Sequence, residues 1–156
     1  MTYFTLKTIH IVFVTMIFGS GMAIVFFKLM ADRTGDPRIV AATMEHVVIA
    51  DLVFTLTAVI GLPLTGLAML GWTIPFPWVH TAFKLYALAG IPWVVAVKLQ
   101  YDMRRLAREA VAEEKPLGPS YWLRTKIWAA LGLPSFTFAV LLIFLMVNRR
   151  LPWEGA

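Results

Sequence analysis

The chain has 156 residues, of which 60% are hydrophobic and 15% are charged, and its mean hydropathy is +0.76. Soluble domains carry about 25% charged residues, so this composition excludes an ordinary soluble domain. There is no cysteine, which excludes disulfides, thiolate metal sites and iron–sulfur clusters. The net charge of +5 fits the basic cytoplasmic loops of a membrane protein better than nucleic-acid binding.

Four apolar stretches are long enough to cross a bilayer whose hydrocarbon core is about 30 Å thick. They predict transmembrane helices at residues 3–30, 39–70, 78–112 and 120–148. The first stretch is too long for a signal-peptide core of about 7–15 residues, so we expect it to be retained. The fold class that follows is all-α, a four-transmembrane-helix bundle forming a single integral membrane domain over residues 1–156.

The connections between these helices predict the orientation of the chain. Residues 31–38 form a charged turn that we expect in water, and residues 71–78, rich in Trp and Pro, form an interfacial loop. Lys and Arg gather near the first and third connections, although Lys7, Arg149 and Arg150 lie near the termini. The basic residues of the two connections are Lys28, Arg33, Arg38, Lys98, Arg104, Arg105, Arg108, Lys115, Arg124 and Lys126. The positive-inside rule then places both connections in the cytoplasm and both termini in the periplasm, for a multi-pass protein of the bacterial inner membrane.

Ionisable residues inside the predicted helices are few, and such residues mark functional sites by default. Because the helices alternate in direction, one group of these residues falls near the inner face of the membrane and one near the outer face. The inner group is His46, Asp51 and Lys98, and the outer group is His10, His80 and Lys84.

The inner group has a structural explanation. We expect Asp51 to pair with Lys98, Arg124 or Lys126, because an unpaired charge in the membrane is costly. His46 lies at the start of its helix and is interpreted as an interfacial histidine.

The outer group favours a ligand. His80 and Lys84 share one helix face, and Lys84 lies about 9 Å from Trp78 by helical rise. The one carboxylate on that side is Glu154 in the tail, so Lys84 either extends its ammonium group to the interface or meets an anionic ligand. Haem has two propionates, and its iron binds histidine.

Helix one adds a second feature to the outer group. His10 and Gly21 are eleven residues apart, about three turns, so they share a face where a flat macrocycle could approach the backbone. Ordinary helix packing through residues 19–21 is the alternative.

Other chemistries have weaker patterns. The eight methionines are scattered, which disfavours a copper site, and there is no phosphate-binding loop and no metalloprotease motif.

Several segments resemble an uncharacterised bacterial family of predicted integral membrane proteins. The similar segments are residues 3–10, 26–33, 46–51, 63–67 and 86–90. The family is distantly similar to the copper-resistance D membrane domain and to the haem-containing bacterial protoporphyrinogen oxidase. In that oxidase, a histidine early in helix one is a haem ligand, and Lys7 and His10 match that arrangement.

The start of the predicted third helix extends the resemblance to the oxidase. Its Trp78, His80 and Lys84 resemble a tryptophan, histidine and lysine of the oxidase, although there the last two are two residues apart and not four. Pro134 resembles a proline in the oxidase's fourth helix.

These observations together predict a membrane protein that binds b-type haem. His10 is the expected first axial ligand and His80 the second, with Lys84 on a carboxylate group and Gly21 beside the macrocycle. The function would be electron transfer or porphyrinogen oxidation, with no catalytic residue assigned. The alternative is a cofactor-free membrane subunit or small transporter. Expected partners are the lipid bilayer and a redox partner or tetrapyrrole, with homo-oligomerisation left open and no nucleic acid.

Overall fold

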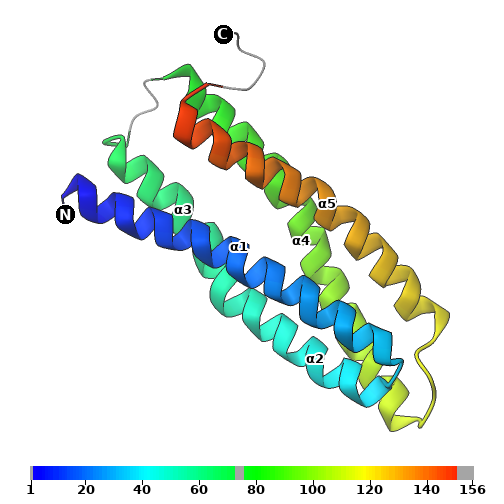
Figure 1. Cartoon of the computed structure of the whole chain (residues 1–156). Coiled ribbons are helices and arrows are strands. Elements are labelled where there is room, and N and C mark those ends of the chain that lie inside the picture. The colour runs from blue at the N-terminus through cyan, green and yellow to red at the C-terminus, as the bar shows by residue number, and fades with distance from the viewer. Residues whose placement is uncertain (1, 73–75, 151–156) are drawn as a thin grey trace.

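The computed structural model describes residues 2–72 and 76–150, and these residues form long antiparallel helices (Figure 1). Four helices are long and apolar enough to cross a membrane: α1 (Tyr3–Thr34), the helix Pro37–Met69, α4 (Pro77–Ala112) and α5 (Pro119–Asn148). The predicted all-α, four-helix membrane fold is therefore confirmed. The second helix consists of α2 (Pro37–Ala50), a π-helical turn η1 (Asp51–Thr55) and α3 (Leu56–Met69).

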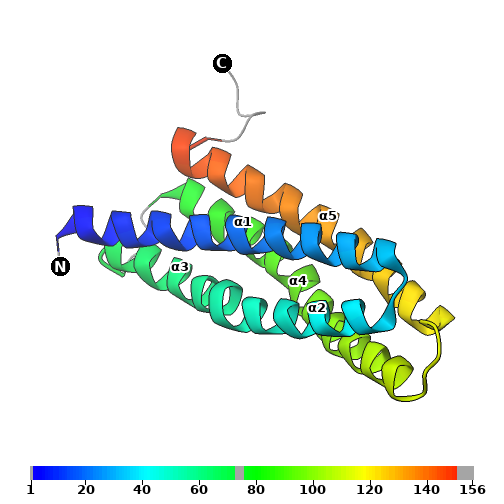
Figure 2. The ribbon, with the colours of Figure 1, turned by 60° about the horizontal axis from the view of Figure 1, so that its bottom comes forward.

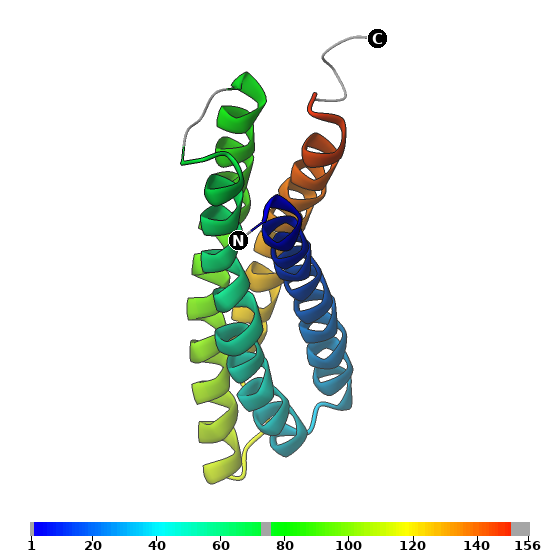
Figure 3. The same ribbon diagram turned by 90° about the vertical axis from the view of Figure 1, so that its left-hand side faces the viewer.

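The helices alternate in direction, so the bundle has two distinct ends. The N-terminal end holds the start of α1, the end of α3, the start of α4 and the end of α5 (Figures 1 and 3). The turn end holds the α1–α2 turn and the α4–α5 connection. Helix α1 packs along α2 and α3, whereas α4 packs along α5 and against α2, an arrangement that is visible from a second side in Figure 2.

The α1–α2 turn begins later than the sequence predicts. Helix α1 runs past residue 30 to Thr34, and Gly35 ends it with a left-handed φ of 66°, a conformation that glycine adopts without a Cβ penalty. Asp36 then caps α2 by accepting a hydrogen bond from the Arg38 N–H at 2.8 Å. The prediction that all charges of residues 31–38 lie in water is wrong for Asp32, which is buried inside the last turns of α1.

The buried core is concentrated at the turn end, with a smaller cluster at the N-terminal end. The larger cluster contains Ile24, Ala31, Val40, Met44, Val47, Ala96, Met103, Ala107, Leu117, Tyr121 and Trp128. The smaller cluster contains Ala82, Leu85 and Leu145. Large apolar side chains also cover the outside of the bundle, for example Phe26, Ile91 and Val147. This surface suits lipid and not water, because lipid tails solvate apolar side chains.

Pro63 lies inside α3 and leaves a backbone carbonyl without its usual partner. Proline has no N–H, so the carbonyl of Val59, four residues earlier, loses its helical hydrogen bond. The Tyr86 hydroxyl of α4 donates a hydrogen bond to this carbonyl. A neighbouring helix thus satisfies the freed group, as the membrane interior requires.

The predicted interfacial loop at residues 71–78 lies partly outside the described residues, since these omit residues 73–75. Of the rest, Gly71 and Trp72 both have positive φ angles, of 63° and 62°, where the chain leaves α3. The rings of Phe76 and Trp78 stack with centroids 6.2 Å apart at the start of α4. Glu154 in the tail also lies outside the described residues.

Candidate functional sites within the bundle

His10 lies at the contact between α1 and α3, near the N-terminal end. Its Nδ1 is 2.8 Å from the Thr65 hydroxyl oxygen. Its ring packs over the backbone of Gly66, where an added Cβ would lie 3.5 Å from the imidazole Cε1. The side chain is only partly exposed. His10 is thus held between two helices and is not a free interfacial residue.

The hydrogen bonds of Thr65 favour one tautomer of His10. The Thr65 hydroxyl has one proton, and its shortest acceptor is the Gly61 carbonyl at 2.7 Å. When the hydroxyl donates to that carbonyl, its oxygen accepts from His10 in the tautomer that carries the imidazole proton on Nδ1. The other ring nitrogen, Nε2, then keeps its lone pair. An imidazole whose N–H is held by a second group while its other nitrogen is free has the arrangement of a metal ligand.

The other predicted haem residues lie apart from this contact. His80 and Lys84 are exposed on α4, and none of the described hydrogen bonds or ion pairs joins either of them to His10. Both lie within the first turns of α4, so they share the N-terminal end of the bundle with His10 (Figure 1). Gly21 has no side-chain or neighbouring-helix atom within 4 Å of the position of an added Cβ, so its face of α1 is open.

No three His, Cys, Asp or Glu side chains come together at a potential metal site within residues 2–72 and 76–150. A metal held by several such protein ligands is therefore not supported in this part of the chain. Haem iron differs, because the porphyrin supplies four nitrogen ligands and the protein only one or two.

Asp51 lies at the π-helical turn, near the middle of the second membrane helix. Asp51 is 14 residues after Pro37, the first residue of this helix, which is about 21 Å along the helix axis. Its side chain is buried, with 6% exposed. The side chains of Thr55, Trp93 and Gln100 lie beside its carboxyl group.

The predicted ion pair of Asp51 is wrong. Lys98 and Lys126 are exposed, and Arg124 pairs instead with Asp102 at 3.6 Å. Lys98 lies at the depth of Asp51, between Val97 and Gln100 of the cavity lining, but its side chain is on the exposed face of α4. His46 is exposed near the start of α2.

Comparison with known proteins identifies the family but no activity. The model of a family described as predicted integral membrane protein (DUF2269) matches residues 4–150. The chain belongs to this family. No curated protein and no solved structure matches it. The comparisons therefore give no support to the distant likeness to the copper-resistance D domain or to protoporphyrinogen oxidase.

Two of the segments that first indicated this family meet in the folded chain. His10, from residues 3–10, contacts Thr65 and Gly66, from residues 63–67. Asp51 ends the segment 46–51, and its surroundings reach α1 through Thr55, whose hydroxyl lies 3.0 Å from that of Ser20. The fold thus joins segments that are separate in the sequence.

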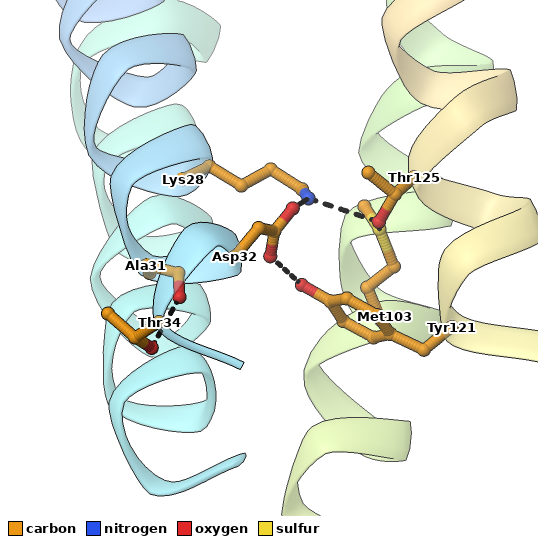
Figure 4. Close-up of polar contacts among 7 residues, drawn as sticks. All are labelled: Lys28, Ala31, Asp32, Thr34, Met103, Tyr121 and Thr125. Atoms are coloured by element: carbon orange, nitrogen blue, oxygen red, sulfur yellow. Dashed lines mark hydrogen bonds and ion pairs between the residues drawn. The ribbon is translucent and has the colours of Figure 1, made fainter. Parts of the chain in front are cut away.

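A buried ion pair within α1, at the turn end, is hydrogen-bonded to two hydroxyl groups of α5 (Figure 4). The Lys28 ammonium, with none of the residue exposed, is 2.5 Å from Asp32 and donates to the Thr125 hydroxyl at 3.2 Å. The Tyr121 hydroxyl donates to the other Asp32 oxygen at 2.5 Å. The Lys28 nitrogen also lies 5.2 Å from the Trp128 ring centroid, which suits a cation–π contact.

This network was not predicted from the sequence, where Lys28 counted only toward the topology. The pattern that could have revealed it is a lysine and an aspartate four residues apart within an apolar helix. All of its charges are satisfied by one another and by hydroxyl groups. The network therefore has the properties of a structural contact that holds α1 against α5, and not of a reactive site.

Proposed function

We propose that this membrane protein binds b-type haem at the N-terminal end of the bundle, with His10 as an axial ligand. The observation that supports the proposal is the contact between His10 and Thr65, which orients the imidazole. In the tautomer protonated on Nδ1, Nε2 has the lone pair that an iron ligand needs. A neutral imidazole in this state is a good iron ligand. When bound, haem supplies one-electron redox chemistry, which suits electron transfer or porphyrinogen oxidation.

The remaining proposed residues are tested separately, because they are not in contact with His10. His80 is proposed as the second ligand and Lys84 as the partner of a propionate, since both lie at the N-terminal end and are exposed. Gly21 is proposed to border the macrocycle, because its face of α1 is open. The support for these three residues is their position, whereas the support for His10 is also its hydrogen bond.

The test is the visible spectrum of the full chain, purified in detergent after expression with added haem precursor. We expect a low-spin b-type spectrum in the reduced protein. His10→Ala should abolish or severely deplete the cofactor, and His80→Ala should shift the spectrum to high spin. Lys84→Ala should weaken haem retention without changing the spin state.

Two further variants sharpen this experiment. Thr65→Val removes the group that orients His10 and should weaken haem affinity by about 10- to 100-fold, as for other outer-shell partners of metal ligands. His46→Ala is the matched control, because His46 is an exposed histidine near the start of α2. A colourless protein, or a spectrum as insensitive to His10→Ala as to His46→Ala, would contradict the proposal. A colourless protein would favour the cofactor-free subunit or small transporter.

We also propose an orientation in the bacterial inner membrane, with both termini periplasmic. Lys28 no longer supports it as a free charge, because Asp32 neutralises it. Arg33, Arg38 and the basic residues from Arg104 to Lys126 still lie at the turn end, which supports a cytoplasmic turn end. Reporter fusions at each terminus should be active only when the reporter functions in the periplasm, and cytoplasmic activity would reverse the orientation.

A further inference from the structure

A small cavity opens beside Asp51, between the π-helical turn and α4. Its volume is about 90 Å³, which is room for about three water molecules at about 30 Å³ each. Asp51 and Leu52 line it from the second membrane helix, and Trp93, Gln100 and Tyr101 line it from α4. The rest of the lining is apolar. The cavity is therefore a polar spot within an otherwise apolar span.

Three polar atoms of this lining have no hydrogen-bond partner among the described residues. They are Asp51 Oδ2, Gln100 Oε1 and Trp93 Nε1. Asp51 is 6% exposed and Gln100 is 3% exposed, so the bulk solvent does not reach these side chains. Buried polar groups in proteins are normally paired, and each exception calls for an explanation.

The backbone at this point is also irregular. The Leu56 N–H bonds to the carbonyl of Asp51, five residues earlier, and not to the carbonyl four residues earlier. Such π-helical turns are rare and occur frequently at functional sites. The turn places Asp51 on α4's side of the helix, while Thr55 in the same turn is tied to Ser20 of α1.

The chemistry of the three atoms fits reversible protonation of Asp51. Gln100 Oε1 can only accept a hydrogen bond, and Trp93 Nε1–H can only donate one. A protonated Asp51 supplies a donor for the glutamine oxygen, and an ionised Asp51 supplies an acceptor for the indole N–H. A metal cation fits poorly, since the indole N–H of Trp93 is a donor only and offers no lone pair to a cation.

None of the described ion pairs brings a basic group to the Asp51 carboxylate. None of the residues that line the cavity is Lys, Arg or His, and Tyr101 is the one other titratable side chain among them. From α1 the nearest contribution is the neutral hydroxyl of Ser20, through Thr55. An ionised Asp51 therefore has no counter-charge in the cavity lining, and a bound proton would neutralise it.

We propose that Asp51 is an intramembrane proton-binding site, which exchanges its proton through water in this cavity. In the binding step a hydronium ion in the cavity gives its proton to Asp51 Oδ2, which forms an O–H bond and leaves a neutral water molecule. Release reverses the step and regenerates the carboxylate. Such a site is an element of proton-coupled membrane proteins, and it is separate from the haem site proposed at His10.

The experiment is infrared spectroscopy of the full chain in lipid nanodiscs, titrated with pH. A protonated carboxylic acid has a carbonyl stretching band, and we expect this band to disappear as the pH rises and to shift in heavy water. Asp51→Asn should remove the band entirely. Asp102→Asn is the matched control, because Asp102 is about one-third exposed and paired with Arg124, and it should leave the band unchanged.

Two further measurements keep the test decisive. Trp93→Phe removes a donor that favours the carboxylate, so the band should persist to higher pH even if Asp51→Asn fails to fold. His10→Ala should leave the titration unchanged, which separates this proposal from the haem proposal. A band unaffected by Asp51→Asn or by Trp93→Phe would overturn the proton site. A titration that shifts when Na⁺ replaces K⁺ would also overturn it, because the site would then bind a metal cation.

Discussion

The buried network around Lys28 gives the sharpest prediction about stability. We expect Asp32→Asn to lower the free energy of unfolding by about 3–5 kcal/mol, the usual cost of removing one partner of a buried ion pair. The asparagine oxygen can still accept a hydrogen bond from Tyr121. Its amide group then faces the Lys28 ammonium, so two donors meet where none of the lysine is exposed.

The chain offers a matched control for this prediction. Arg105 and Glu109 form an ion pair of the same i,i+4 spacing, but with 65% and 52% of the two side chains exposed. Glu109→Gln should cost at most about 1 kcal/mol, because surface ion pairs contribute little. The two substitutions remove the same charge from the same kind of pair, so burial is the main difference between them.

The assay is reversible unfolding in mixed micelles, followed by circular dichroism. A triple variant, Lys28→Met with Asp32→Leu and Tyr121→Phe, should recover most of the loss, since apolar residues often replace a buried ion pair without cost. If Asp32→Asn lowered the free energy of unfolding no more than Glu109→Gln, the buried network would not stabilise the contact between α1 and α5 as we infer.

The same assay tests three further predictions, the first with its own control substitution. Gly61→Ala should cost about 1–3 kcal/mol, because its Cβ would lie 2.3 Å from the Phe13 ring; Gly19→Ala, which meets no atom within 4 Å, should be tolerated. Tyr86→Phe should cost about 1–3 kcal/mol, because it leaves the carbonyl freed by proline without a donor. Glu45→Gln should cost about 1 kcal/mol or less, and less still at high salt, because its arginine partners on α4 are partly exposed.

Local sequence patterns were sufficient to predict the helices. A run of apolar residues in a membrane must satisfy its backbone internally, so length and hydropathy indicate where the helices run. The largest error was at the end of the first helix, where charges at residues 31–38 suggested an early exit into water. Asp32 remains in the helix because Tyr121 and Lys28, one of them 89 residues away in the sequence, bind its carboxylate.

The sequence by itself determined the membrane class, the four helices, and His10 and Asp51 as residues that need an explanation. It could not determine their surroundings, because the neighbouring groups come from other helices: Thr65 beside His10, and Trp93 and Gln100 beside Asp51. Hydropathy depends on each segment alone, whereas a buried polar group is explained only by the groups that helix packing brings within hydrogen-bonding distance. For the same reason, only the tertiary structure showed that Lys28 is buried in an ion pair with Asp32 and is not a loop charge.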